Sequence, residues 1–314
     1  MTVHLIAVGT SILDNFDRPA AVCGKDSDAA AAIATAKPHL LLAAAGDKDQ
    51  ASNWIAAALQ AHGQQSSSER AELKRVTAKA RPDLWPAGIS AEVATLARPP
   101  VRARTLPRTD MAFLVCSDTT PGLVAGLWNA IALTGNDLDR VSYLADPDSA
   151  TDPEQGKAVI VRVSKMDAAS RDDFMTAMKG MGTLGHHLVE SARIAADEPF
   201  LFYLSGGYKA AIPYLIGLAE GLRSLDRKRP VKAYVLHESA PPGTSLIELP
   251  LRYMHPDRVT SELGKFDQGV RQSVPDPPLL EGYAYEVSGG KCILTAFGAG
   301  LSSLFGLDTP GLGE

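Results

Sequence analysis

Short, continuous apolar runs alternate along the chain with segments whose apolar residues recur at helical spacing. The apolar runs at 5–8, 111–116, 141–144, 159–163, 200–204 and 231–236 have the length of buried strands. Helical patterns cover 29–36, 49–62, 69–80, 123–133 and 215–225, and a longer helical pattern over 167–196 contains a candidate break. Because strands that alternate with helices indicate βαβ units, we expect an α/β fold with a mostly parallel central sheet flanked by helices.

The pattern changes after Pro250. Proline and glycine mark the last segment, in which 283–294 predicts a β-hairpin and 296–304 a short apolar helix. We therefore expect a main domain over 1–250 and a small C-terminal appendage over 251–314. A winged-helix remnant is one interpretation of the appendage, although no basic recognition helix stands out in it.

Three polar segments follow predicted strands, at Gly9–Asn15, Ser117–Gly122 and Ser205–Lys209. In parallel sheets, ligands bind outside the carboxyl ends of the strands, where such loops converge. We therefore expect the three loops to lie side by side and to form one site.

The third loop, Ser205–Lys209, has the composition of a phosphate-binding turn. Two glycines between a strand and a helix let backbone N–H groups approach a ligand, and Lys209 adds an ammonium group beside them. The plainer interpretation is that Lys209 is a solvated lysine. A cation at the positive end of a helix is unfavourable by a few tenths of a kcal/mol, and a bound anion would remove that conflict.

Composition limits the kinds of ligand and partner that the protein is expected to bind. A net charge of −5 and a pI of about 5.8 argue against duplex DNA as a partner, but they allow a small anion in a local basic pocket. No run approaches the roughly 20 apolar residues of a membrane span, and Met1–Val8 lacks the features of a signal peptide. The three cysteines have no metal-ligand spacing. We expect a cytoplasmic protein with no membrane partner, no metal and no cofactor.

Five segments, in order, resemble the CARF domains of type III CRISPR systems, in the branch that includes stand-alone ring nucleases. The likeness covers about residues 1–250 and departs at Ser205, where the family more often has threonine. The matching segments are Val8–Leu13, the Ser-Ala-Glu motif at Ser90–Glu92, the Ser-Asp-Thr loop within Cys116–Thr119, the Gly-Gly-Tyr-Lys loop within Ser205–Lys209, and Leu236–Ser239 followed by Leu246–Pro250.

The resemblance implies a Rossmann-like domain that forms a homodimer and binds a cyclic oligoadenylate messenger across its two-fold axis. Cyclic tetra-adenylate is the expected ring, with the hexamer as the alternative. It further implies metal-independent cleavage to linear products with a 2′,3′-cyclic phosphate, which ends the antiviral signal. Lys209 would stabilise the charge that develops on the phosphate, and Ser11 would bond the attacking hydroxyl or a phosphate oxygen. The ligand-binding residues implied are Gly9, Thr10, Ser11, Ile12, Ser117, Asp118, Thr119, Thr120, Ser205, Gly206, Gly207, Tyr208 and Lys209.

Other interpretations of the same residues stay open. Ser11 is also typical of a turn cap, and Ser117–Thr119 are typical of a helix N-cap, where Asp118 would repel phosphate. At the level of function, the alternative is a non-cleaving sensor or transcriptional regulator that acts through the appendage. A Rossmann dehydrogenase fits far less well, because the first strand is not followed by Gly-x-Gly-x-x-Gly.

Overall fold

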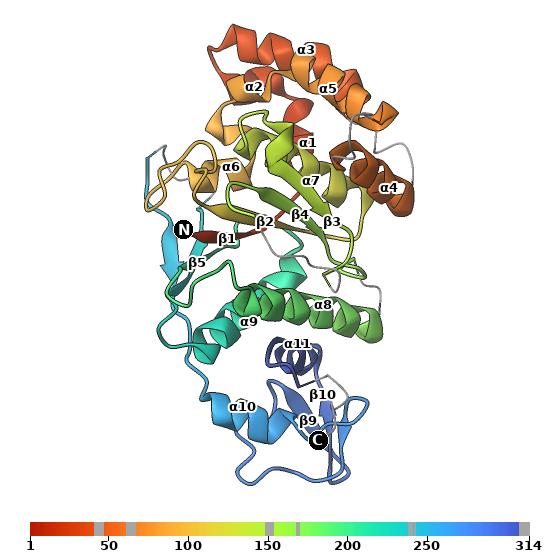
Figure 1. The fold of residues 1–314 in the computed structure, drawn as a ribbon, viewed down its shortest axis with the longest axis vertical. Coiled ribbons are helices and arrows are strands. Elements are labelled where there is room, and N and C mark those ends of the chain that lie inside the picture. The colour runs from red at the N-terminus through yellow and green to blue at the C-terminus, as the bar shows by residue number, and fades with distance from the viewer. Residues whose placement is uncertain are drawn as a thin grey trace.

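A seven-stranded sheet forms the centre of the molecule (Figure 1). The computed structural model describes residues 1–40, 47–60, 67–147, 154–167, 170–237, 241 and 243–307. The strand order is β3-β4-β2-β1-β5-β6-β7, and of these strands β7 alone runs antiparallel to its neighbour. The strands are β1 Val3–Ala7, β2 Met111–Cys116, β3 Val141–Leu144, β4 Ala158–Arg162, β5 Phe200–Tyr203, β6 Val231–Val235 and β7 Ile247–Leu249. The predicted α/β fold with a mostly parallel sheet is confirmed, and it is Rossmann-like.

Helices cover both faces of this sheet (Figure 1). One face carries α1 Ser11–Phe16, α2 Pro19–Cys23, α3 Ser27–Leu40, α4 Lys48–Leu59, α5 Ser68–Ala80, α6 Ala91–Leu96 and α7 Thr120–Leu133, and the other carries α8 Arg171–Glu190 and α9 Ile212–Leu225. Within the described ranges, no helix combines the length and the apolar character needed to cross a bilayer. Residues 61 and 62 of one predicted helix lie outside these ranges, as do Glu238 and Ser239.

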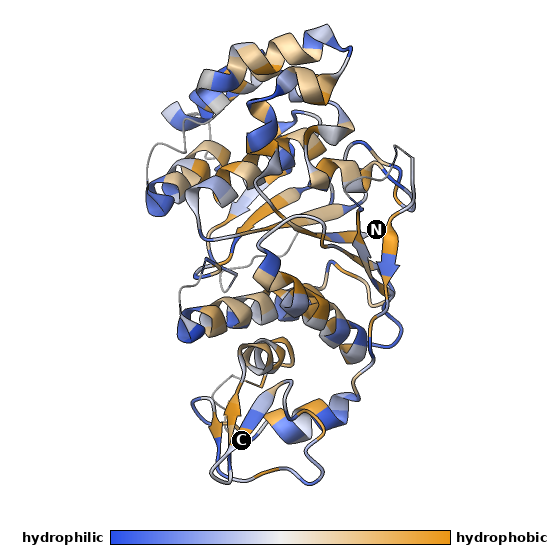
Figure 2. Ribbon diagram, turned by 180° about the vertical axis from the view of Figure 1, so that it is seen from behind, coloured by the Kyte–Doolittle hydropathy of each residue, from blue (hydrophilic) through white to orange (hydrophobic). Residues whose placement is uncertain are grey.

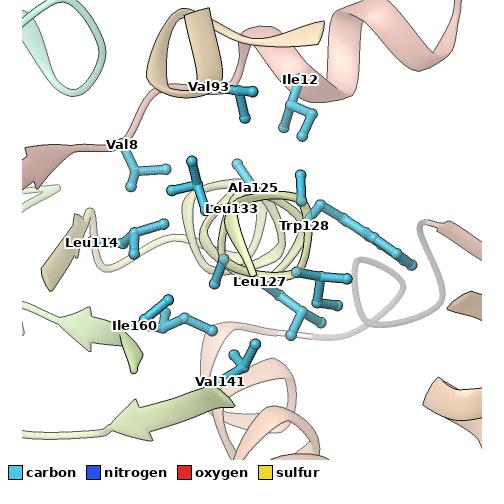
Figure 3. Close-up of a cluster of buried hydrophobic side chains, with 14 of the residues drawn as sticks. Val8, Ile12, Val93, Leu114, Ala125, Leu127, Trp128, Leu133, Val141 and Ile160 are labelled. Carbon is cyan, nitrogen blue, oxygen red and sulfur yellow. The ribbon is translucent and has the colours of Figure 1, made fainter. Parts of the chain in front are cut away.

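Two hydrophobic clusters lie on either side of the sheet, and alternate residues of each strand enter them. In β1 and the residue after it, Ile6 and Val8 pack beneath α1–α7, whereas Leu5 and Ala7 pack toward α8 and α9. Because both faces are buried, the central strands are mostly apolar, as Figure 2 shows, and His4 of β1 is the polar exception. Figure 3 shows how side chains from the sheet, α1 and α6 surround α7.

The C-terminal appendage packs below α8 and α9 (Figure 1). It contains α10 Pro256–Leu263, β8 Val270–Arg271, β9 Tyr285–Ser288, β10 Lys291–Leu294 and α11 Ala296–Leu304. The predicted hairpin and final helix are confirmed. α11 approaches α8 so closely that a Cβ on Gly182 would lie 2.9 Å from the carbonyl carbon of Gly300 and closer still to its oxygen. The hydrophobic cluster beneath the sheet continues into the appendage through Leu301 and Leu304 of α11.

Three local predictions are wrong. Gly9–Asn15 is not a loop, because α1 begins at Ser11, where Ile12 and Phe16, one helical turn apart, both bury their side chains. The helix after the Gly-Gly turn begins at Ile212 rather than Leu215, and a single 3₁₀ turn, Lys209–Ala211, precedes it. The helical pattern predicted over 167–196 extends too far, because α8 runs without a break only from Arg171 to Glu190 and residues 191–196 are not helical.

Candidate functional site

The loops that follow β1, β2 and β5 lie along one edge of the sheet. β1 is central, with β2 on one side and β5 on the other, and all three strands are parallel. The chain leaves β1 toward β2 through α1–α6, and it leaves β5 in the opposite direction through α9. The loops after β1 and β5 therefore flank a topological switch point, which is the usual ligand position in such sheets.

A buried glutamate joins the loops after β1 and β5. The Glu92 side chain, in α6, accepts a hydrogen bond at Oε1 from the Gly9 backbone N–H at 2.7 Å. Ser90 caps α6 by accepting a hydrogen bond from the Val93 N–H, and this cap fixes the first turn in which Glu92 lies.

The third loop lies so close to β1 and Glu92 that its two glycine positions leave no room for a side chain. A Cβ on Gly206 would lie 2.6 Å from the Ala7 carbonyl oxygen and even closer to Glu92 Oε1. Gly207 has a φ of +91°, a conformation that residues with a side chain rarely adopt. The Gly-Gly pair therefore holds the third loop directly against the first.

The third loop contains backbone N–H groups that have no acceptor within the described part of the chain. The N–H groups of residues 206–210 donate no hydrogen bond to any described residue. Lys209 is exposed and forms no ion pair with a described residue, and Tyr208 is 43% exposed. Ser205 is occupied differently, since its Oγ accepts a hydrogen bond from the Leu236 N–H at 2.6 Å. Backbone N–H groups without a described acceptor, beside an ammonium group, suit an anion.

Residues of the first loop divide between its surface and the core. Thr10 is exposed and precedes α1 without forming a side-chain cap, so the capping role considered for Ser11 belongs to neither hydroxyl. Ser11 begins α1, and its Oγ is buried with no hydrogen-bond partner among the described residues. Gly9 uses its N–H on Glu92 and cannot offer it to a ligand.

Ile12 differs from its expected role. Its side chain is fully buried and points toward α7 together with Val93 (Figure 3). It packs in the core and offers no side-chain contact to a ligand at this edge.

The second loop is ordered mainly by its own hydrogen bonds. Thr119 caps α7 by accepting a hydrogen bond from the Gly122 N–H at 3.1 Å, and its hydroxyl lies 3.0 Å from that of Ser117. Thr120 is the first residue of α7. The capping interpretation is therefore correct for Thr119, and Ser117 is occupied in supporting it.

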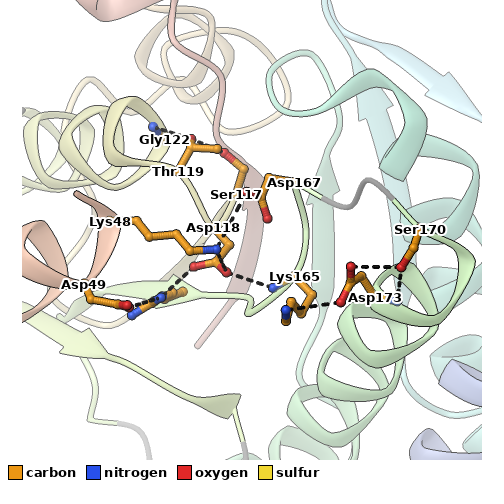
Figure 4. A network of polar contacts seen from close by, with 11 residues as sticks. Lys48, Asp49, Ser117, Asp118, Thr119, Gly122, Lys165, Asp167, Ser170 and Asp173 are labelled. Atoms are coloured by element: carbon orange, nitrogen blue, oxygen red, sulfur yellow. Dashed lines mark hydrogen bonds and ion pairs between the residues drawn. The ribbon is translucent and has the colours of Figure 1, made fainter.

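Asp118 is neutralised by cations rather than facing an open site (Figure 4). Its side chain is buried, and Lys48 Nζ and Arg162 Nε each lie 2.7 Å from its carboxylate. The Lys165 backbone N–H donates a third hydrogen bond at 3.0 Å. Burial alone would raise the pKa of Asp118, but these hydrogen bonds outweigh it and lower the pKa below its ordinary value. The repulsion between Asp118 and phosphate, expected from sequence, is thereby compensated.

Glu92 is the residue that the site prediction omitted. Burial raises its pKa, and the hydrogen bond from Gly9 opposes that rise only in part. Its second oxygen, Oε2, is buried with no hydrogen-bond partner among the described residues. The Ser-Ala-Glu motif pointed to this segment, but the contact with Gly9 spans 83 positions and has no local signal.

Among the residues described, no group of three or more histidine, cysteine, aspartate or glutamate side chains is arranged to hold a metal ion. A scan against protein-family models finds no match for this chain, and no curated protein matches its sequence.

Proposed function

We propose that the protein binds cyclic oligoadenylate at the edge of the sheet formed by the loops after β1, β2 and β5. The observation that carries this proposal is the run of N–H groups at 206–210, which have no acceptor among the described residues. They lie beside Lys209, which forms no ion pair with a described residue, at the switch point of the sheet. Each nucleotide of the ring carries one phosphate, and the N–H groups and the Lys209 ammonium group are suited to bind it. The resemblance of the same segments to CARF domains supplies the ligand class.

In the proposed complex, two protomers bind one ring, and each places its third loop against symmetry-related phosphates. Cyclic tetra-adenylate is the expected ring, with the hexamer as the alternative.

The proposed reaction is cleavage by the ligand's own ribose. The 2′-oxygen attacks the adjacent phosphorus, the bond from phosphorus to the 5′-oxygen breaks, and a 2′,3′-cyclic phosphate forms. The 2′-hydroxyl loses a proton and the departing 5′-oxygen gains one, so no redox partner is required. Lys209 and the free N–H groups would stabilise the charge that develops on the phosphate oxygens. Ser11 Oγ, which has no hydrogen-bond partner among the described residues, would bond the attacking hydroxyl or a phosphate oxygen.

Incubation of the protein with labelled cyclic tetra-adenylate in EDTA tests cleavage. We expect linear product with a 2′,3′-cyclic phosphate, and a rate at least about 100-fold lower for Lys209→Ala, because such charge stabilisation accounts for about 10²–10³ in rate. Lys265→Ala, another exposed lysine with no ion pair to a described residue, is the control and should cleave normally. A ring that stays intact over many turnover times would exclude cleavage.

One observation favours the alternative of a sensor that acts through the appendage. Tyr208 and Ala210 line a groove of ≈ 540 Å³ that Glu286 and Thr295 of the appendage also line. A ligand on the third loop would therefore contact, or lie beside, the appendage. Tight ring binding without cleavage, together with a ligand-dependent mobility shift of promoter DNA, would select this function.

A further inference from the structure

A basic pocket lies at the opposite edge of the sheet from the proposed oligoadenylate site. It encloses ≈ 760 Å³ near the beginning of β6 and the end of β7. Because β5 and β6 are parallel, the beginning of β6 and the loop after β5 lie at opposite edges. The charged residues that line the pocket are Arg223, Arg227, Arg229, Lys232 and Glu248.

Arg229 is the buried member of this group. Its side chain is 4% exposed and its guanidinium lies 4.8 Å from the centre of the Phe200 ring. Its Nε and Nη1 atoms have no hydrogen-bond partner among the described residues. Burial lowers the pKa of Arg229, although the nearby carboxylates of Asp226, Asp197 and Glu198 oppose this effect. Burying a guanidinium is costly, and an anion in the pocket beside it would offset part of that cost by its charge.

The other cations are arranged around the pocket opening. The Arg227 guanidinium lies 4.1 Å from the centre of the Tyr253 ring, which fixes its position, and Arg223 donates a hydrogen bond to the Leu251 carbonyl. Lys232 is paired with Glu248 at 3.0 Å. Four cations therefore face one carboxylate among the lining residues, in a protein whose net charge is −5.

We propose that this pocket is a second anion site, which binds the phosphate groups of a ligand that carries at least two of them. Guanidinium groups bind phosphate oxygens through paired hydrogen bonds, and three guanidiniums exceed what one phosphate needs. The site is independent of the loops after β1, β2 and β5, because it shares no residue with them. The phosphates could belong to a free polyphosphate or to a linear oligonucleotide.

Binding experiments in a Lys209→Ala background test this site while the proposed oligoadenylate site is weakened. The probes are inorganic tripolyphosphate and a linear tetra-adenylate, measured by calorimetry at low ionic strength. We expect saturable binding of at least one probe, weakened about tenfold or more by Arg223→Ala combined with Arg227→Ala. Arg258→Ala, an exposed arginine on α10, is the matched control and should bind as the background does.

The two probes identify the source of the phosphates. Tighter binding of tetra-adenylate would assign a nucleic-acid backbone, and tighter binding of tripolyphosphate would assign a small polyphosphate. Absence of binding by both probes, or equal affinity in the double variant, would overturn the proposal. Arg229 is buried and its replacement would disturb the fold, so the test uses substitutions at the exposed residues Arg223 and Arg227.

Discussion

At the scale of single residues, Glu92 positions the loops after β1 and β5. It accepts a hydrogen bond from the Gly9 N–H, and its Oε1 lies against Gly206. Its burial beside backbone atoms leaves no space for any side chain at position 206. Two consequences of this arrangement can be measured separately. One is the effect of a side chain at position 206 on stability, and the other is the effect of Glu92 protonation on stability.

Replacement of Gly206 by alanine should destabilise the protein by about 1–3 kcal/mol, because the new methyl group would overlap Glu92 and the Ala7 carbonyl. Urea denaturation measures the change in the free energy of unfolding. Gly88→Ala is the control, since a Cβ there meets nothing within 4 Å and should change stability by less than about 0.5 kcal/mol. Equal stabilities for the two variants would show that the loops are not in the close contact described.

Replacement of Glu92 by glutamine should stabilise the protein increasingly as pH rises. The folded protein holds a proton on Glu92 above the ordinary carboxyl pKa of 4.5, whereas the unfolded chain releases it there. The folded state therefore binds more protons, and the Glu92 contribution to stability falls as pH rises from that value through the raised pKa. Each unit of the rise is worth about 1.4 kcal/mol, and glutamine retains an oxygen for the Gly9 N–H.

Unfolding free energies of wild type and Glu92→Gln at pH 5 and pH 8 provide the measurement. Other ionisable groups are common to both proteins and cancel in the difference. A difference that stays constant between the two pH values would contradict the raised pKa.

At the scale of elements, the sequence predicts best the strands that are buried on both faces of the sheet. Met111–Cys116 was predicted with its observed bounds because every residue in it is buried, so its apolar run has no gaps. α1 was missed because only Ile12 and Phe16 of its residues are buried, which is too short a pattern to recognise. The roles of Glu92 and of Lys48, which neutralises Asp118, depend on distant contacts that no local pattern encodes.

The contact between α8 and α11 allows a prediction within a single helix. Gly182→Ala should push α11 from α8 and cost about 1–3 kcal/mol, because its Cβ would overlap the Gly300 carbonyl. Gly180→Ala, two positions earlier in α8, meets only Pro147 at 3.6 Å and should instead stabilise the helix by up to about 1 kcal/mol. Thermal or urea unfolding measures both, and the same sign of change for the two variants would contradict the described packing.

At the scale of the whole molecule, the sheet separates the two edges at which we propose anion binding. The carboxyl edge contains the loops after β1, β2 and β5, and the amino edge of β6 contains the Arg229 pocket. The appendage is held against α8 and α9, and it shares a groove with the third loop. This arrangement places the proposed messenger site where a bound ring would contact both the main domain and the appendage.

Calorimetric titration of the protein with cyclic tetra-adenylate in EDTA tests the central claim most directly. The account predicts saturable binding with one ring per two chains, and binding weakened about tenfold or more in Lys209→Ala but unchanged in Lys265→Ala. An absence of binding at low ionic strength, or equal affinity in the Lys209→Ala variant, would contradict it.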